Sequence, residues 1–366
     1  MSRPLRILQM THQGDFGGST NSITYLTGGL ADRGHEVYLA VREESLLWER
    51  FQNHARVKLI PFQFGRSPLD VRRSRAIRDI AEERSIDILN AHASVDRHLS
   101  IQARRIFRGR FRLVHTRRNV PLSSGGKLQG RYYAAGTDRI IAVSQAVADG
   151  MIAGGVPEDH VSVVHNGIPL ERYEHVDAAK VGAIRERLEL PEGTRVVGVV
   201  ARKKSQEELM RAMVGIPDNV VLLFLGIDHD EELERLRKEL ALPHRVIYAG
   251  FQMDVLPWYE LLTVYVLPSI IEGFSLSILE AMARSLPVVC TNAGGNPEAI
   301  EDGENGFLFE PGDVPRIHTA LETLLGDEPL RLRFKKNNAE KVRARFSVEN
   351  TIRNAEAVYR SLLPDA

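Results

Sequence analysis

The chain has 366 residues, a hydrophobic fraction of 43% and a formal net charge of zero, so it is long enough to bury the cores of two domains. Its single cysteine, Cys290, excludes a disulfide framework and a cysteine zinc site, and its apolar neighbours predict a buried core residue. The first apolar run is too short for a signal peptide and no run of about 18 apolar residues follows, which indicates a soluble intracellular protein.

The first predicted elements are a strand over residues 5–10, the glycine-rich turn THQGDFGGS, a helix and a second strand over residues 37–41. This βαβ opening is typical of a Rossmann-like domain. Its glycines do not match the dinucleotide fingerprint, Gly-x-Gly-x-x-Gly directly after the strand, so we do not expect NAD to bind.

Further strands alternate with helices along the rest of the chain, which predicts an α/β fold with parallel sheets covered on both faces. Residues 167–193 interrupt the alternation and contain Pro169 and Pro191, as a linker would. The expected organisation is an N-terminal domain, a linker, a C-terminal domain and a terminal helix, over residues 1–168, 169–194, 195–345 and 346–366.

Residues 97–137 contain ten basic residues and no acidic one. The run suits either a solvated face or contact with an anionic membrane surface or phosphorylated acceptor, with Arg104, Arg105 and Arg108 as membrane-contact candidates. We do not expect this run to bind nucleic acid, because it lacks interleaved aromatic residues and matches no nucleic-acid-binding motif. Up to Leu170 the chain has 24 basic and 16 acidic residues, a balance of +8, and the remainder has 24 and 32, a balance of −8.

Asp228 and Asp230 form an Asp-x-Asp pair, a pattern that in some enzymes holds a metal-bound nucleotide sugar. Both precede an amphipathic helix, so a helix-cap role is the better interpretation and no metal is predicted. Further along, the stretch AGGNPEAI predicts a helix with Asn296 as its N-cap. Gly294 and Gly295 would let the backbone approach a ligand, or simply precede a well-capped helix.

The segment from Val264 to Thr291 predicts a strand, a loop, a helix and a strand. A helix start leaves its first backbone N–H groups without intrahelical partners and carries partial positive charge. The loop glycine and the amides that follow it are therefore candidates for holding a phosphate: Gly273, Phe274, Ser275 and Leu276.

Two glutamates flank this candidate phosphate site: Glu272 lies in the loop and Glu280 lies inside the helix. Two acids would repel a bare phosphate, but they suit a ligand that carries hydroxyl groups beside its phosphates. An alternative remains for Glu280, because Ser277 and Glu280 fit the Ser-x-x-Glu capping box.

The stretch EGFSLSILEAMARSLPVV closely resembles the signature of family 4 retaining glycosyltransferases of the GT-B fold, in which seven residues separate two glutamates. The resemblance covers nearly the whole chain, through the Gly17–Gly18 loop, LADRGHEV, HNGI, VLPSIIEGF and GGNPEAIEDGENGFLF. It implies two Rossmann-like domains facing a cleft, a nucleotide-sugar donor on the C-terminal domain and an acceptor on the N-terminal one. It implies no metal and no further cofactor, and a terminal helix that packs back on the N-terminal domain.

The resemblance also implies roles for the donor residues. Glu280 would bind the ribose hydroxyls, Glu272 the hydroxyls of the transferred sugar, and the amides after Gly273 the diphosphate. Arg202 and Lys204, or Lys203 in place of Lys204, would neutralise the departing diphosphate, on which negative charge develops as the sugar–phosphate bond breaks.

On the acceptor side, the family often places a histidine near the transferred sugar after a strand like LVHTRRN. Here that position is either His115, which we prefer, or Arg118. The other acceptor-side candidates are Asp15, Gly17, Gly18 and Asp96, with His92 nearby. His12, His92 and His98 are otherwise interpreted as structural histidines.

The predicted function is a retaining, metal-independent glycosyltransferase that moves a sugar from a UDP- or GDP-linked donor to a glycan or lipid-linked acceptor in cell-envelope synthesis. It would be cytoplasmic or peripheral on the inner membrane face. The alternatives are a nucleotide-sugar epimerase of the same fold and a non-catalytic nucleotide-sugar binding protein.

Overall fold

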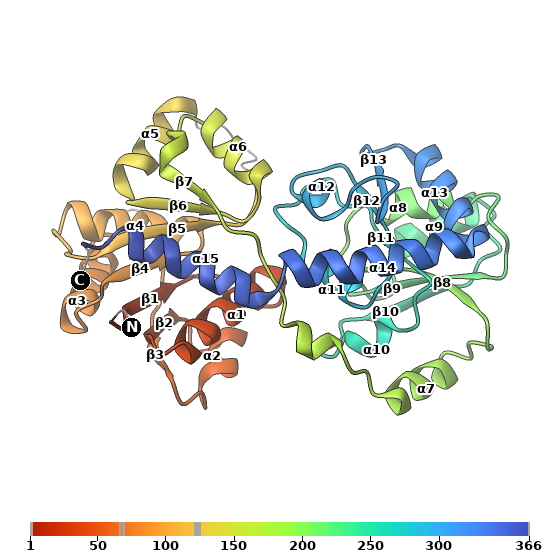
Figure 1. Ribbon diagram of the computed structural model, residues 1–366, viewed down its shortest axis with the longest axis horizontal. Helices are drawn as coiled ribbons and strands as arrows, with labels where there is room; N and C mark the ends of the chain where they lie inside the picture. Colours follow the sequence, from red (N-terminus) through yellow and green to blue (C-terminus); the bar gives the residue numbers. More distant parts are fainter. Residues whose placement is uncertain (1–2, 66, 68–69, 121–125, 365–366) are drawn as a thin grey trace. The chain divides into compact units, whose positions relative to one another are not determined.

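The computed structural model of the chain describes residues 3–65, 67, 70–120 and 126–364, which form two compact units. Unit 1 contains the residues up to Ile168 together with those from Val348, and unit 2 runs from Pro169 to Ser347. Each unit is built on a parallel sheet with helices packed against it, and Figure 1 labels the elements. The predicted α/β class is therefore confirmed.

The sheet of unit 1 consists of β1 Arg6–Met10, β2 Glu36–Val41, β3 Val57–Pro61, β4 Ile88–Ala91, β5 Arg112–Arg117, β6 Arg139–Ala142 and β7 Val161–Val163. Among the described residues its order is β3-β2-β1-β4-β5-β6-β7, with every pair parallel. The order reverses between β1 and β4. In an open parallel sheet, ligands bind beside the carboxyl ends of the strands at such a reversal.

The helical elements of unit 1 are α1 Gly18–Asp32, α2 Leu46–Phe51, α3 Val71–Glu83, α4 Ser94–Arg105, α5 Gly126–Gly136, α6 Gln145–Ala153, the 3₁₀ turn η1 Glu158–His160 and α15 Val348–Ser361. Side chains alternate across the sheet, so Ile7 packs with residues of α1, α2 and α15 while Leu8 packs with residues of α3 to α6. The last helix, α15, lies against α1, where a Cβ on Gly29 would lie 2.0 Å from Cδ1 of Ile352. This contact explains why α1 carries a glycine there.

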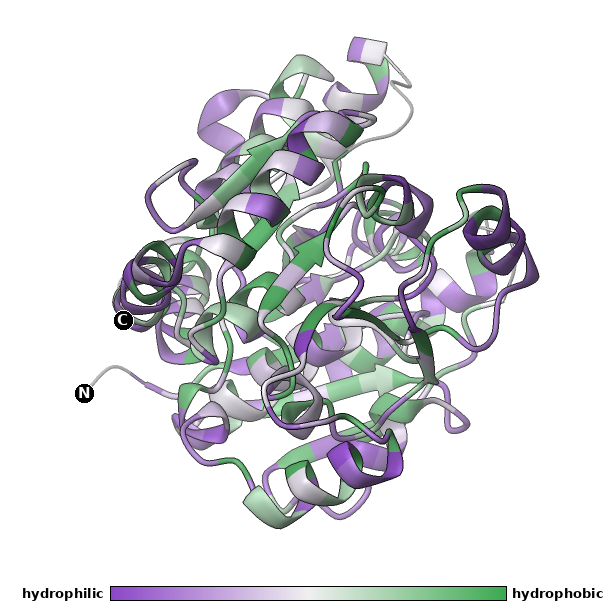
Figure 2. Cartoon of the chain, turned by 90° about the vertical axis from the view of Figure 1, so that its right-hand side faces the viewer, coloured by the Kyte–Doolittle hydropathy of each residue, from purple (hydrophilic) through white to green (hydrophobic). Residues whose placement is uncertain are grey.

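The sheet of unit 2 consists of β8 Arg195–Val200, β9 Val220–Leu225, β10 Val246–Gly250, β11 Val264–Leu267, β12 Val288–Thr291 and β13 Gly306–Phe309. Its order among the described residues is β10-β9-β8-β11-β12-β13, again parallel, and it reverses between β8 and β11. Every residue of β9 is buried, as its continuous apolar run VVLLFL predicts for a strand covered on both faces. In Figure 2 the strands are largely hydrophobic and much of the helical surface is hydrophilic.

The helical elements of unit 2 are the 3₁₀ turn η2 Leu170–Tyr173, α7 Ala178–Arg187, α8 Gln206–Ala212, α9 Glu231–Glu239, α10 Leu256–Tyr259, α11 Leu276–Ala283, α12 Asn296–Ala299, α13 Val314–Gly326 and α14 Glu328–Arg345. The sequence analysis missed α7 and assigned its residues to a linker. None of the residues of α7 is buried, so it has no apolar stripe that periodicity could reveal. Cys290 is wholly buried, as predicted.

Candidate functional site

The start of α11 has no side-chain cap. Ser275 is the N-cap residue, but its hydroxyl accepts from no backbone amide and lies instead 3.0 Å from the hydroxyl of Ser277. The Ser277 hydroxyl in turn accepts a hydrogen bond of 2.7 Å from Tyr265. The structure thus leaves the first turn of α11 without the side-chain acceptor that usually satisfies its N–H groups, as suits an anion site.

Glu280 has a different environment from the one a capping box requires, so that interpretation is wrong. Its Oε1 accepts a hydrogen bond of 3.0 Å from the Tyr173 hydroxyl, and its Oε2 accepts one of 2.9 Å from Tyr259. The side chain points into the unit and only 6% of the residue is exposed. Burial raises the pKa of Glu280, and the two tyrosine hydrogen bonds lower it by less.

Glu272 forms an ion pair with Lys204. Lys204 follows β8 and Glu272 follows β11, so the pair lies at the point where the strand order reverses. Glu272 is 9% exposed, and its loop is held by the loop after β12. The Gly295 amide donates to the Gly273 carbonyl at 3.0 Å, and a Cβ on Gly294 would lie 1.8 Å from the Glu272 carbonyl oxygen.

The two neighbouring lysines of the β8 loop have different partners. Lys203 Nζ lies 2.8 Å from Asp230 and 2.5 Å from Glu232, both at the start of α9, whereas Lys204 reaches Glu272. Lys204 is therefore the lysine that adjoins the α11 loop. Arg202 is exposed, and within the described part of the chain its guanidinium has no hydrogen bond or ion pair, so the structure does not join it to this pair.

The helix-cap interpretation is confirmed for Asp230, whose carboxylate accepts the Glu232 and Leu233 amides of α9, each at 3.0 Å. Asp228 lies before the cap and is exposed. Within the described ranges, no group of three or more His, Cys, Asp or Glu side chains is arranged to hold a metal ion.

The expected N-cap role of Asn296 is wrong. Gly295 is the N-cap residue of α12 and Asn296 is already helical. The Asn296 side chain donates instead to the Thr291 carbonyl, at 3.2 Å, and so ties the helix to the end of β12. Asn and Gly both suit a helix start, so composition alone did not separate the two positions.

In unit 1, Asp96 is wholly buried in the first turn of α4. Its carboxylate accepts the amides of His92 and Ala93 at 2.8 and 2.7 Å, and its other oxygen lies 2.7 Å from Nδ1 of His12. Asp96 therefore joins the loops after β1 and β4 rather than lining an open surface. Sequence reasoning treated His12 as structural, and no local signal linked it to a carboxylate 84 positions away.

His115, our preferred candidate near the transferred sugar, is 1% exposed. Its Nδ1 donates to the Ala91 carbonyl at 2.9 Å, and its Nε2 accepts from the Arg97 guanidinium at 2.7 Å. Burial, followed by the charge of Arg97, holds the pKa of His115 well below its ordinary value. Both ring nitrogens of His115 are engaged within the unit, so this arrangement does not itself support the catalytic role that we expected for His115.

Arg118 follows β5 and lines a small cavity with Ser22 and Asn166. Its guanidinium donates to the Ser22 hydroxyl at 2.9 Å and to Nδ1 of His92 at 3.0 Å. No carboxylate of a described residue pairs with Arg118, and burial lowers the pKa of its guanidinium to about 10. Of the two alternatives, Arg118 directly follows β5, whereas His115 lies within the strand.

The other acceptor-side candidates lie in the loop after β1 and at the start of α1. Gly17 is the N-cap residue of α1 and Gly18 is its first residue, and a Cβ on Gly17 would meet no atom within 4 Å. Asp15 is exposed and forms an ion pair of 3.0 Å with Arg42. These three residues are solvent-accessible, in contrast to Asp96.

The proposed membrane-contact arginines differ in exposure. Arg104 forms a bidentate ion pair with Asp138, in which two guanidinium nitrogens lie 2.5 and 2.9 Å from the two carboxylate oxygens. Its guanidinium is therefore not available to an external anion. Arg105 and Arg108 are exposed. No helix in the described ranges has the length and apolar character needed to cross a membrane.

The chain is similar in sequence to known glycosyltransferases. Residues 182–341 match the family model of glycosyl transferases group 1, and residues 16–172 match that of glycosyltransferase family 4. The lipopolysaccharide core biosynthesis mannosyltransferase LpcC of Rhizobium leguminosarum bv. viciae is 30% identical over 62% of this chain and 66% of its own. N-acetyl-alpha-D-glucosaminyl L-malate synthase of Bacillus anthracis is 25% identical over 95% of both chains.

The chain belongs to glycosyltransferase family 4. The family 4 enzyme has the GT-B fold, as shown by its likeness to Anabaena Alr3699/HepE in complex with UDP-glucose. That structure is 22% identical, has a TM-score of 0.84 and aligns over 97% of this chain and 100% of its own. Because the matched families and relatives are glycosyltransferases, the epimerase and non-catalytic alternatives are not favoured for this glycosyltransferase.

Proposed function

We propose that this glycosyltransferase transfers a sugar, with retention and without a metal, from a nucleotide sugar on unit 2 to a glycan or lipid-linked acceptor on unit 1. Its place would be in cell-envelope polysaccharide or glycolipid synthesis. The observation that carries the proposal is the Lys204–Glu272 pair beside the uncapped start of α11. A cation, a helix start and a carboxylate together suit a ligand with both phosphates and hydroxyl groups.

In this proposal each residue that binds the nucleotide-sugar donor has one role. The amides from Phe274 to Leu276 hold the diphosphate, Lys204 neutralises the charge that develops on it, and Glu272 binds sugar hydroxyls once the donor separates it from Lys204. Glu280 binds the ribose hydroxyls and is oriented by Tyr173 and Tyr259. Preorganised donors of this kind lower the barrier because they do not have to reorient as charge develops.

The domain assignment belongs to the same proposal. Residues 1–168 would form the acceptor domain and residues 195–345 the donor domain, joined by residues 169–194, with residues 346–366 returning to the acceptor domain. A UDP- or GDP-linked sugar is the proposed donor. The likeness to HepE, which was solved with UDP-glucose, makes UDP-glucose the first donor to test.

The proposed enzyme activity is tested by measuring both the binding and the turnover of nucleotide sugars. A panel of UDP, GDP and ADP sugars is screened by thermal shift, since a ligand that binds only the folded state raises its stability. Donors that raise the melting temperature are then assayed for transfer and for hydrolysis. Tight nucleotide binding with no turnover of any donor would overturn the enzyme proposal.

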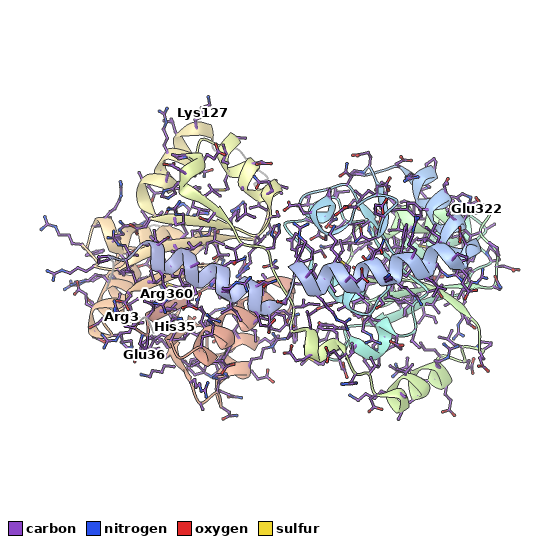
Figure 3. The ribbon with its side chains drawn as sticks, viewed as in Figure 1. Arg3, His35, Glu36, Lys127, Glu322 and Arg360 are labelled. Carbon is purple, nitrogen blue, oxygen red and sulfur yellow. The ribbon has the colours of Figure 1, made fainter. Side chains whose placement is uncertain are left out.

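We further propose that the glycosyltransferase acts at the cytoplasmic face of a membrane as a peripheral protein. Support comes from an exposed patch at the end of α4 and on α5, the α4–α5 patch: Arg105, Ile106, Arg108, Lys127, Leu128 and Tyr132. Leu128 is 79% exposed, and the Lys127 side chain extends outward from α5 (Figure 3). Cations beside exposed apolar residues suit an anionic lipid surface.

Vesicle sedimentation tests this membrane proposal. Replacing Arg105, Arg108 and Lys127 by glutamine should weaken binding to anionic vesicles in a salt-dependent way. A matched control replaces Arg235, Lys238 and Lys336, three exposed cations of unit 2. Equal sedimentation of both triple variants and the wild type would argue against the α4–α5 patch.

A further inference from the structure

A chain of buried hydrogen bonds within unit 1 joins the C-terminal helix α15 to Arg118. The hydroxyl of Tyr359, on α15, lies 2.8 Å from Nδ2 of Asn90, on β4. The same Nδ2 lies 3.1 Å from Oε1 of Gln9, on β1, and that oxygen lies 2.7 Å from Nε2 of His92. Nδ1 of His92 lies 3.0 Å from the Arg118 guanidinium. All four residues that precede Arg118 in this chain are buried.

The chemistry of Arg118 fixes the direction of each hydrogen bond in the chain. A guanidinium has donors only, so Nδ1 of His92 accepts. Burial, followed by the charge of Arg118, holds the pKa of His92 well below its ordinary value, so the ring is neutral and carries its proton on Nε2. Nε2 then donates to the Gln9 carbonyl oxygen, which also accepts from the Asn90 amide, and the other proton of that amide goes to Tyr359.

Gln9 and Asn90 are unusual residues for their positions. They lie opposite each other on the neighbouring strands β1 and β4, in a sheet covered on both faces, where parallel strands usually carry apolar residues. Burying an amide costs free energy unless hydrogen bonds replace those it made to water. A network of this kind holds its members in one arrangement, and here the Asn90 Oδ1 also accepts from the Thr116 hydroxyl at 3.0 Å.

The other end of the chain is a cation without a carboxylate partner. Among the described residues, the guanidinium of Arg118 donates to neutral groups: the Ser22 hydroxyl at 2.9 Å, the His92 ring and, at 3.5 Å, the Asn166 side chain. Arg118 directly follows β5 and is partly exposed. A guanidinium held in this way suits a ligand that offers hydroxyl, carboxylate or phosphate oxygens.

We infer that Tyr359, on the C-terminal helix, is a positioning residue that holds Arg118 in the orientation that binds the acceptor. This inference rests on the proposed function, in which unit 1 binds the acceptor. Tyr359 does not touch the acceptor. It fixes the Asn90 amide, and the constraint passes through Gln9 and His92 to the guanidinium. The docking of α15 on α1 therefore also completes the acceptor site.

Tyr359→Phe tests the inference, because it removes the hydroxyl and keeps the ring. One hydrogen bond between neutral groups is lost, so the KM for the acceptor should rise roughly 2- to 10-fold. The nucleotide Kd should not change, because the chain of hydrogen bonds lies within unit 1. Tyr38→Phe is the matched control, since Tyr38 is a buried tyrosine of the same unit whose hydroxyl bonds to Glu36. Its acceptor KM should equal that of the wild type.

A double variant shows whether Tyr359 acts through Arg118. Arg118→Gln removes the cation and should raise the acceptor KM roughly 10- to 100-fold. Adding Tyr359→Phe to Arg118→Gln should then raise the KM little further, because the residue that Tyr359 positions is already gone. A thermal melt of each variant shows that it is folded. Effects that multiply in the double variant would overturn the positioning role.

The ring of His92 provides a measurement that does not need turnover. Nitrogen NMR of the wild type should show a neutral ring protonated on Nε2, with the resonance assigned by its absence in His92→Gln. The Nε2 proton should exchange with water faster in Tyr359→Phe than in the wild type or in Tyr38→Phe. A wild-type ring protonated on Nδ1, or the same exchange rate in Tyr359→Phe, would overturn the inference.

Failure of the inference and failure of the proposed function give different results. An active wild type whose acceptor KM does not change in Tyr359→Phe would overturn the inference and leave the proposed function intact. An inactive wild type with every donor would overturn the proposed function, and with it the acceptor role of Arg118.

Discussion

The hydroxyl of Tyr173 donates a hydrogen bond of 3.0 Å to Oε1 of Glu280, across 107 positions in the chain. Tyr173 ends the 3₁₀ turn η2, at the start of unit 2, and is 2% exposed. Tyr259 holds the second carboxylate oxygen. The orientation of Glu280 therefore depends on two elements outside the helix that carries it.

Removal of one of these hydroxyl groups should weaken nucleotide binding. In Tyr259→Phe, Glu280 loses the donor on Oε2, and hydrogen bonds to charged groups contribute about 1.5–3 kcal/mol. We expect the nucleotide Kd to rise by roughly 10-fold or more in calorimetry. Tyr248→Phe is the control, because Tyr248 bonds to Glu234 on α9. An unchanged Kd in Tyr259→Phe would show that Glu280 does not need this support.

The buried carboxyl of Glu280 should make stability depend on pH. Burial raises its pKa, so the folded state binds the proton more tightly than the unfolded state. The stability due to this group is present at low pH and is lost as pH rises through the raised pKa. Glu280→Gln does not titrate, so the variant should gain stability relative to the wild type as the pH rises from the ordinary pKa of a glutamate through the raised pKa of Glu280. Urea unfolding of both proteins measures this, and a difference that does not change with pH would contradict it.

The adjacent lysines of the β8 loop should have unequal effects on catalysis. Lys204 pairs with Glu272, whereas Lys203 pairs with Asp230 and Glu232. Lys204→Ala should lower kcat by roughly 10²- to 10³-fold, as loss of one electrostatic donor does in comparable sites. Lys203→Ala should stay within about twofold, because surface ion pairs contribute little. A larger loss in Lys203→Ala would reverse the assignment.

Gly294→Ala should separate the two loops that position Glu272. Its Cβ would lie 1.8 Å from the Glu272 carbonyl oxygen, closer than any non-bonded contact allows. Gly312→Ala is the control, since Gly312 also has a positive φ but a Cβ there would meet no atom within 4 Å. The control should cost only the left-handed backbone penalty of about 1–2 kcal/mol. Gly294→Ala should lose more stability in urea unfolding and most of the transfer activity, and equal losses would refute the steric explanation.

Much of the architecture follows from the sequence alone. Buried runs such as VVLLFL predict strands, and their alternation with helical periods predicts parallel sheets, because each pattern reflects local geometry. The sequence also predicted the spacing of Glu272 and Glu280 and the glycine-containing loop between the strand and the helix. These features depend on residues close together in the chain.

Other features depended on the tertiary structure. The sequence did not reveal whether Lys203 or Lys204 adjoins Glu272, which hydroxyl groups hold Glu280, or which partners His115 and Arg118 have. Each depends on which strands are neighbours and on which way a side chain leaves its strand, and local periodicity encodes neither. His12 and Asp96 are 84 positions apart and become partners only because β1 and β4 pair in one sheet.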